Sequence, residues 1–354
     1  MNRSEESKYK VNLIRSLLEK TGHAGIIIKK QPNFSWISAG GRGFIGLASE
    51  GACAAIVVTK DGVYVAGNNI ELPRLVSEEF PEGFAEPISL PWQEDGTIDA
   101  LLKKRFGKLT NDAEQDAWFR KTRVNLLECE EARYAKLGKI SAQGLEEVCA
   151  SIKPGISEFE IAGRISELYW AAGIEPITVL IAADERSSLL RHYVPTAKKA
   201  KKGVICSICA RAGGLVVSAT RLVSFSKNFS PDYKNLLKVE QAAFEATRPG
   251  MEMGIIYKNL VDAYTQNGFP REWNNHHQGG LTGYQAREIR VLPDTKEKVS
   301  AHQAFAWNPS VIGAKCEDTV LVDENGSLSV LTKSSKDWPA QKIGSILRPG
   351  ILEK

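Results

Sequence analysis

The pattern of apolar and polar positions predicts alternating helices and strands in the first third of the chain. Residues 11–20 carry leucine and isoleucine at helical spacing, and residues 25–28 form a short apolar run typical of a buried strand. A hairpin is expected over residues 54–66, because Asp61 and Gly62 separate two apolar runs and favour the positive φ angles of a tight turn. With further helical stretches between strands, this order predicts an α/β domain that ends near residue 122.

The pattern changes to long helices after this point. Residues 124–151 predict one helix with an apolar face, which Pro154-Gly155 ends. Ser157 and Glu160 have the spacing of a capping box that begins the next helix.

The same order of elements occurs a second time. A helix is expected at 236–247, a Pro249-Gly250 break follows, and a second helix is expected at 255–267 before strand-rich segments. Residues 124–218 and 237–320 therefore share an order of long helix, break, second helix and strands, which predicts a duplicated α+β domain.

Composition narrows the class of protein. A chain of 354 residues favours two domains, and 43% hydrophobic with 25% charged residues is ordinary for globular proteins. The net charge of +4 is too small to indicate nucleic-acid binding. No apolar run approaches the length of a membrane span, the first residues lack the apolar core of a signal peptide, and six scattered cysteines favour reduced thiols. We therefore expect a cytoplasmic protein with no membrane or nucleic-acid partner.

Four segments of the second half concentrate histidine, arginine and acidic residues. They are Arg191 to Thr196, Ser207 to Arg221, His276 to Glu288, and Ala306 to Thr319. In this order and at this spacing they resemble the pita-bread family of creatinase, aminopeptidase P and prolidase. The resemblance implies a smaller creatinase-type α/β N-terminal domain over residues 1–122 and a pita-bread α+β domain with pseudo-twofold duplication over residues 123–354. It also implies a homodimer, with residues 33–43 as an exposed loop that borders the partner's site.

The resemblance also identifies the positions at which the family's metallopeptidases bind two divalent metal ions. Their ligands are two aspartates separated by ten residues, a histidine between glycines, and two glutamates. Here the matching residues are Ser207, Ser218, Gly280, Asn308 and Glu317, of which Glu317 alone is a carboxylate. One carboxylate cannot offset two divalent charges. We therefore expect no metal cofactor, with a divalent ion such as Mn as the alternative.

Other polar residues match positions near the substrate in this family. His192 corresponds to the histidine that is the catalytic base in creatinase, and a neutral imidazole suits proton transfer near neutral pH. His276 matches an outer histidine, and Arg287 stands where the pattern often has another. The predicted catalytic residues are therefore His192 and Glu317. The predicted substrate-binding residues are His276, His277, Arg287, Ser207, Ser218 and Asn308.

Each of these residues also has a structural interpretation. His192 and His277 could simply satisfy polar groups of the fold, and Glu317 could form a buried ion pair with Arg211 or Arg221. A serine nucleophile at Ser207 or Ser218 would need an adjacent base. Trp273 and Trp307 flank the motifs and could either wall a pocket or pack in the core.

Three functions follow from the sequence. The first is a metal-independent hydrolase that cleaves a C–N bond in a small amino-acid, amide or dipeptide-like substrate, with His192 as general base. The second is a metal-dependent Xaa-Pro dipeptidase or aminopeptidase with unusual ligands. The third is a non-catalytic pita-bread protein that binds peptides.

Overall fold

The computed structural model of the chain describes residues 1–344 and 346–354. Within them the chain divides into two compact units. Unit 1 comprises Met1–Arg123 with Gly213–Leu215, and unit 2 comprises Val124–Ala212 with Val216–Lys354.

Unit 1 is built on a five-stranded sheet in the order β4-β3-β2-β1-β5. β1 and β3 are antiparallel to β2, whereas β4 is parallel to β3 and β5 is parallel to β1. The predicted hairpin is confirmed, since β2 and β3 pair across Asp61 and Gly62. The strands are β1 (Gly25–Lys30), β2 (Gly51–Thr59), β3 (Val63–Asn68), β4 (Glu86–Leu90) and β5 (Leu109–Asn111).

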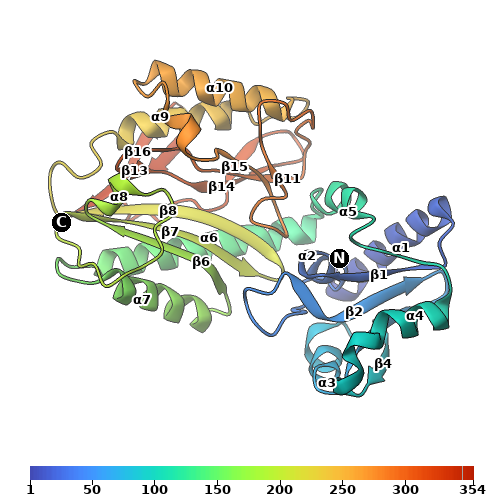
Figure 1. The fold of residues 1–354 in the computed structure, drawn as a ribbon. Helices are drawn as coiled ribbons and strands as arrows, with labels where there is room; N and C mark the ends of the chain where they lie inside the picture. The colour runs from blue at the N-terminus through green and yellow to red at the C-terminus, as the bar shows by residue number, and fades with distance from the viewer. Residues whose placement is uncertain (345) are drawn as a thin grey trace. The chain divides into compact units, whose positions relative to one another are not determined.

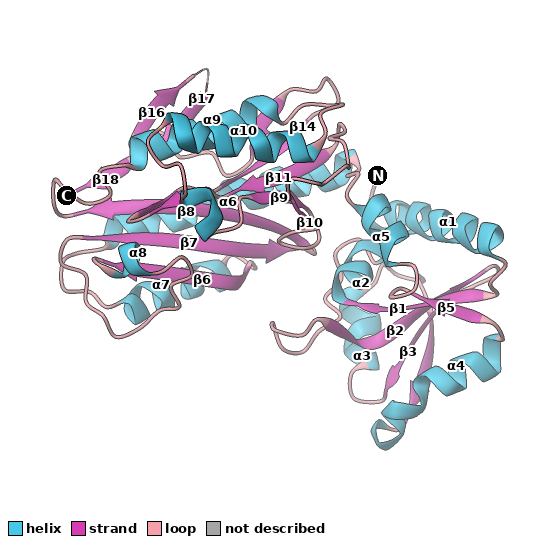
Figure 2. Ribbon diagram, turned by 45° about the horizontal axis from the view of Figure 1, so that its top comes forward, coloured by secondary structure: helices cyan, strands magenta, loops and turns pink. Residues whose placement is uncertain are grey.

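One long helix, α1, and several short helices surround this sheet (Figure 2). The expectation of an exposed loop at residues 33–43 is wrong for its first part, because Asn33–Ile37 lies in α2 and is buried. Trp36 of this helix packs edge-on against Phe119. The helices are α1 (Arg3–Thr21), α2 (Gln31–Ile37), α3 (Leu72–Arg74), η1 (Leu75–Glu79), η2 (Trp92–Thr97), α4 (Ile98–Phe106) and α5 (Asp116–Arg123).

Unit 2 contains two larger sheets, in the orders β18-β8-β7-β6 and β10-β9-β11-β14-β15. Two small hairpins, β12-β13 and β16-β17, accompany them. The strands are β6 (Glu175–Ala183), β7 (Gly203–Ala212), β8 (Leu215–Ser224), β9 (Gly279–Thr282), β10 (Ile289–Arg290), β11 (Gln303–Trp307), β12 (Ser310–Val311), β13 (Ala314–Lys315), β14 (Asp318–Val322), β15 (Leu328–Val330), β16 (Ala340–Ile343), β17 (Ile346–Pro349) and β18 (Ile351–Glu353).

Two pairs of long helices cover this unit, with α6 and α7 near β6 and β7, and α9 beside α10 (Figure 1). The predicted capping box is present, since Ser157 Oγ accepts from the Glu160 amide and the Glu160 carboxylate accepts from the Ser157 amide. The helix expected from residue 124 begins at Glu128. The helices are α6 (Glu128–Ser151), α7 (Glu158–Ala171), α8 (Arg186–Leu189), α9 (Tyr233–Ala246), α10 (Met253–Gln266) and η3 (Glu272–Asn275). The mixed α+β fold agrees with the pita-bread expectation.

Buried charges join the two larger sheets of unit 2. Arg221 of β8 pairs with Glu146 at 2.7 Å and with Asp318 of β14 at 3.2 Å. Arg348 of β17 pairs with Asp318 at 2.7 Å and also with Glu240. Removing one member of such a buried network leaves an uncompensated charge, which typically costs about 3–5 kcal/mol. The network therefore holds β8 and β14, which belong to different sheets, in fixed positions.

The two tryptophans that flank the motifs differ in environment. Trp307 is fully buried, stacks on Phe305 and donates its indole N–H to Thr247 Oγ1 at 3.0 Å, so it is a core residue. Trp273 is half-buried and lies edge-on to Tyr257. In the described ranges, no helix combines the length and apolar character that crossing a bilayer requires.

Candidate active site

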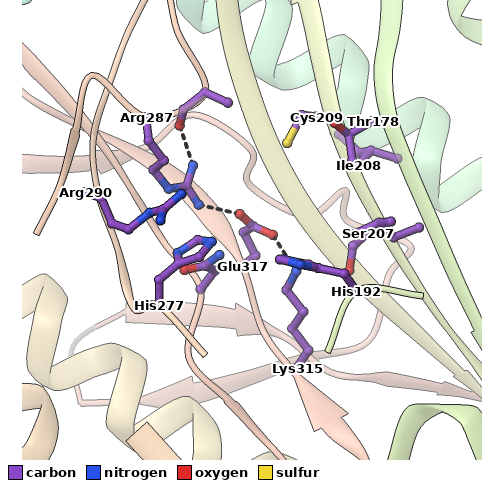
Figure 3. A pocket seen from close by; sticks show the side chains of 13 residues that line it. Thr178, His192, Ser207, Ile208, Cys209, His277, Arg287, Arg290, Lys315 and Glu317 are labelled. Carbon is purple, nitrogen blue, oxygen red and sulfur yellow. Dashed lines mark hydrogen bonds and ion pairs between the residues drawn. The ribbon is translucent and has the colours of Figure 1, made fainter. Parts of the chain in front are cut away.

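A pocket of about 440 Å³ lies within unit 2. This volume is in the range of sites for small ligands. Figure 3 shows polar side chains from β7, from the segment before β9, from the β9–β10 connection and from the β13 region facing one another. The lining residues are Thr178, Leu180, His192, Ser207, Ile208, Cys209, His277, Ala286, Arg287, Arg290, Asn308, Lys315 and Glu317.

Glu317 is held between two cationic side chains. Arg287 Nη2 donates to Glu317 Oε1 at 2.7 Å, and Lys315 Nζ lies 3.2 Å from Oε2 (Figure 3). All three side chains are largely buried, with exposed fractions of 12% for Arg287, 5% for Lys315 and 4% for Glu317. Both carboxylate oxygens are therefore already engaged by the protein.

The cations determine the protonation of this cluster. Burial disfavours ionisation of Glu317, but Lys315 and Arg287 more than offset this, so the pKa of the carboxyl lies below its usual value. Burial likewise opposes the charge on Lys315, but Glu317, Tyr193 and Cys209 together outweigh it, so the pKa of the ammonium is raised. The cluster thus holds two positive charges against one negative charge, and exposed Arg290 at the rim adds a third positive charge.

Three histidines meet at one side of the pocket. His192 lies in the loop between α8 and β7, and His276 and His277 lie between η3 and β9. Arg191, next to His192, forms an ion pair with Glu272 of η3, the helix that directly precedes His276, and this contact holds the two segments together. His192 Nε2 is 3.1 Å from His276 Nε2, and the rings of His276 and His277 stack at 4.4 Å.

The environment keeps these imidazoles neutral. Burial, with Lys315 next in effect, lowers the pKa of His276 to about 2. Burial, followed by Arg287, lowers the pKa of His277 to about 3. The pKa of the more exposed His192 is also lowered, by partial burial and then by Lys315, while Glu317 opposes this shift. A neutral imidazole retains the lone pair that a base or a metal ligand requires.

The serines and Asn308 form hydrogen bonds or packing contacts within the fold. The hydroxyls of Ser207 and Thr220 hydrogen bond at 2.8 Å. Ser218 is fully buried behind the pocket wall, where its hydroxyl contacts Cys209 Sγ at 3.3 Å. Asn308 lines the pocket, and its Oδ1 has no hydrogen-bond partner among the described residues.

Gly280 has a backbone conformation that excludes a side chain. Its φ is +146°, and a Cβ atom at this position would lie 2.2 Å from the carbonyl oxygen of Ile289. The close approach follows from the pairing of β9 with β10, in which Gly280 is opposite Arg290. A histidine at position 280 therefore requires the backbone to move.

Most of the sequence-predicted site residues gather in one place. Six of them line the pocket: His192, Ser207, His277, Arg287, Asn308 and Glu317. His276 does not line it but contacts His192, which does. Ser218 lies behind the pocket wall, in contact with Cys209. The structural alternative for Glu317 was a buried ion pair with Arg211 or Arg221. Glu317 is in a buried ion pair, but with Arg287 and Lys315. Arg211 pairs with Glu175, and Arg221 pairs with Glu146 and Asp318.

Sequence reasoning missed Lys315 and Arg290. Lys315 had a detectable signal, because it precedes Glu317 by two residues in a strand-forming segment, where alternate residues share a face. Arg290 lies in the two-residue strand β10, whereas Arg287 lies in the irregular connection before it, so no regular spacing relates the directions of the two side chains.

The family was identified by comparison with known proteins. Residues 132–324, more than half of the chain, match the model of metallopeptidase family M24. A Xaa-Pro dipeptidase of Pyrococcus horikoshii is 25% identical over 353 residues, covering 93% of this chain and 98% of the relative. These matches define a hydrolase class that acts on peptide C–N bonds. The chain belongs to the metallopeptidase family M24.

Solved structures share the fold over nearly the whole chain. The prolidase from Pyrococcus horikoshii OT3 superposes with a TM-score of 0.77 at 20% identity, covering 93% of this chain and 99% of the other. The X-Pro aminopeptidase from Thermotoga maritima gives a TM-score of 0.76 at 15% identity and covers 100% of both chains. The pita-bread expectation for the fold is confirmed.

The family implies divalent metal ions, and the residues at the five matching positions do not fit them. Ser207, Ser218 and Asn308 are neutral, and Gly280 has no side chain. Both oxygens of Glu317, the remaining carboxylate, are bound to Arg287 and Lys315. Hard divalent ions need several oxygen ligands with negative charge, which this set does not provide.

Proposed function

We propose that this protein hydrolyses a C–N bond in a small amide or dipeptide-like substrate that carries a carboxylate, without the dinuclear metal centre of its family. The observation that carries the proposal is the double ion pair of Glu317 with Arg287 and Lys315. The side chains of Arg287 and Lys315 thus place two positive charges beside the one carboxylate that remains of the family's metal ligands. In the metallopeptidases that the sequence resembles, two metal ions would supply the positive charge at this place. The pocket has room for a ligand of this size and an excess of positive charge.

The positive charge supports an anionic substrate. Arg287, Arg290 and Lys315 line the pocket with one carboxylate among them. A guanidinium presents two parallel N–H groups that match a carboxylate, and Arg290 at the rim is free of the ion pair that engages Arg287. Arg290 therefore receives the substrate carboxylate in this proposal.

The chemistry needs a base and a means of stabilising negative charge. His192 accepts a proton from water as the water oxygen attacks the carbonyl carbon. Lys315 and Arg287 have N–H groups beyond those bonded to Glu317, and these stabilise the negative charge that develops on the carbonyl oxygen. His192 then donates the proton to the leaving nitrogen as the C–N bond breaks, which yields an amine and a carboxylic acid.

The named relatives favour a second candidate, a metal-dependent Xaa-Pro dipeptidase. The two candidates differ in their response to chelation. Full-length protein dialysed against EDTA would be assayed on Xaa-Pro dipeptides and on N-acyl and carbamoyl amino acids, with and without added Mn²⁺, and its metal content measured.

The proposal expects turnover of a carboxylate-bearing substrate that survives chelation and is abolished in His192→Gln. His23→Gln, in unit 1, is the matched control and should retain full turnover. Turnover that depends on about two Mn²⁺ ions per chain would establish the second candidate instead. Turnover unaffected by His192→Gln would exclude the proposed base.

A further inference from the structure

The three pocket histidines converge on a common point. One ring nitrogen from each of His192, His276 and His277 lies within 4.8 Å of the others. Ligands of a tetrahedral zinc ion, with Zn–N bonds of about 2.0–2.1 Å, stand about 3.3 Å apart. The 3.1 Å between Nε2 of His192 and Nε2 of His276 is close to that spacing. The ligand nitrogen of His277 lies within 4.8 Å of the other two, so it completes the set once it moves to the same spacing.

The hydrogen bonding of this cluster is incomplete without a further partner. Nδ1 of His277 is buried and has no hydrogen-bond partner among the described residues. Nδ1 of His276 is unpaired as well, but this ring already presents Nε2 to His192, so its Nδ1 is not the ligand atom. A buried polar atom left unpaired costs about 1–3 kcal/mol. Stacking the rings of His276 and His277 supplies no partner for either nitrogen. Apart from the contact between Nε2 of His276 and Nε2 of His192, no hydrogen bond of these ring nitrogens among the described residues explains why the rings of His276 and His277 lie so close together.

We infer that His192, His276 and His277 form a binding site for a single borderline transition-metal ion such as Zn²⁺, distinct from the five family ligand positions. Three imidazoles with an open fourth position are a ligand set that zinc accepts. His192 and His277 also line the pocket, so the open position faces it.

The charges around the cluster select among ions. Lys315, Arg287 and Arg290 are positive, Glu317 is shared between the first two, and Arg191 is neutralised by Glu272. Hard ions such as Mn²⁺ and Mg²⁺ depend on negatively charged oxygen ligands and are excluded by this setting. Zn²⁺ binds imidazole strongly enough to occupy the site despite the positive side chains around it. An anion in the fourth coordination position would offset part of this positive charge.

A Zn²⁺ ion bound to the three histidines lowers turnover, whereas the metal ions of a metallopeptidase are required for turnover. The ion binds the lone pair of His192, which the proposed reaction needs for proton transfer. This consequence rests on the proposed function: Zn²⁺ inhibits turnover where the family's ions would support it.

The binding claim is tested without any activity assay. Metal-stripped full-length protein would be titrated with Co²⁺ as a spectroscopic probe, and Zn²⁺ bound after dialysis would be counted by elemental analysis. We expect one ion per chain with the visible absorption of a tetrahedral Co²⁺ site, and no binding of Mn²⁺. His276→Gln, His277→Gln and His192→Gln should each lose saturable binding, while Glu317→Gln and the remote control His23→Gln should keep it.

Two results would overturn the site. One is wild-type protein that binds no Zn²⁺ beyond the level of the double variant His276→Gln/His277→Gln. The other is binding that survives these changes but is lost in Glu317→Gln. Circular dichroism verifies that each variant is folded, and the loop variant His192→Gln serves as the test if the two half-buried positions 276 and 277 do not tolerate change. If Zn²⁺ binds and turnover rises, the inhibitory role is wrong; absence of any turnover would instead refute the proposed function and leave the binding result standing.

Discussion

Arg287 Nη2 lies 2.7 Å from Glu317 Oε1, and this contact defines the electrostatics of the pocket. It joins the β9–β10 connection to the segment between β13 and β14, where Lys315 engages the second carboxylate oxygen. The carboxylate is thus a shared counter-charge for two buried cations, and each member of the cluster depends on the others.

The first prediction concerns this shared charge. Glu317→Gln removes the counter-charge of two largely buried cations and should lower the free energy of unfolding by about 3 kcal/mol, measured by chemical denaturation. The double variant Glu317→Gln/Lys315→Met should recover part of the loss, because it also removes one unpaired cation. If the two changes simply add, the ion pair does not stabilise the fold.

The second prediction concerns the backbone at Gly280. Gly280→Ala places a Cβ against the Ile289 carbonyl and forces an unfavourable φ, so the free energy of unfolding should fall by at least about 2 kcal/mol. Gly283→Ala is the matched control, because its Cβ would meet its nearest neighbour, Glu288 Oε1, at 3.5 Å. Gly280→His should be destabilised at least as much and should gain no Mn²⁺ binding. Equal stability of the two alanine variants would contradict the steric argument.

The third prediction concerns stability and pH in metal-free protein. The folded state lowers the pKa of His276 to about 2 and that of His277 to about 3, whereas an unfolded histidine titrates near 6.5. The folded protein therefore binds fewer protons than the unfolded chain below about pH 6.5. The free energy of unfolding is therefore highest above about pH 6.5 and decreases as the pH falls towards 3, because protons bind to the unfolded chain in preference to the folded protein.

Chemical denaturation at a series of pH values measures this effect. His276→Gln should flatten the decline between about pH 6.5 and pH 4, while His23→Gln should leave it close to that of the wild type. A wild-type curve without any decline over this range would show that the two imidazoles are protonated in the fold.

The fourth prediction concerns the role of Arg290. Arg290→Gln should raise KM for a carboxylate-bearing substrate by about tenfold, since a guanidinium–carboxylate contact in a partly exposed site contributes about 1.4 kcal/mol. The value of kcat should change little, because Arg290 does not contact the reacting bond in the proposed arrangement. Arg271→Gln, an exposed arginine outside the pocket lining, is the control.

A substrate whose carboxylate is amidated separates binding from a general loss of function. Its KM should be high for the wild type and unchanged by Arg290→Gln. An equal effect of the substitution on both substrates would show that Arg290 does not recognise the carboxylate.

Local signals in the sequence predicted local structure well. The Asp61-Gly62 hairpin and the capping box of Ser157 and Glu160 depend on residues within a few positions of one another, and both are present. The start of α6 was placed four residues too early, because an apolar pattern does not fix where a helix begins.

Contacts between distant segments were harder to predict. Motif order placed His192, Arg287 and Glu317 in one pocket correctly. The structural alternative for Glu317, a buried ion pair with Arg211 or Arg221, named the kind of contact but not its partners, because the sequence does not show which arginine the strand pairing brings to the carboxylate. In the structure Arg221 is engaged by Glu146 and Asp318, which leaves Arg287 and Lys315 for Glu317.

The conformation of Gly280 limits the substitutions that could give this pocket the metal ligands of its family. Because a side chain at position 280 collides with the neighbouring strand, a single codon change there cannot return a liganding imidazole. The strand would have to shift as well, and Ser207 and Ser218 would still lack the carboxylates that a divalent ion requires. Several coupled changes, and no single one of them, would therefore be needed to give this pocket the metal ligands of its family.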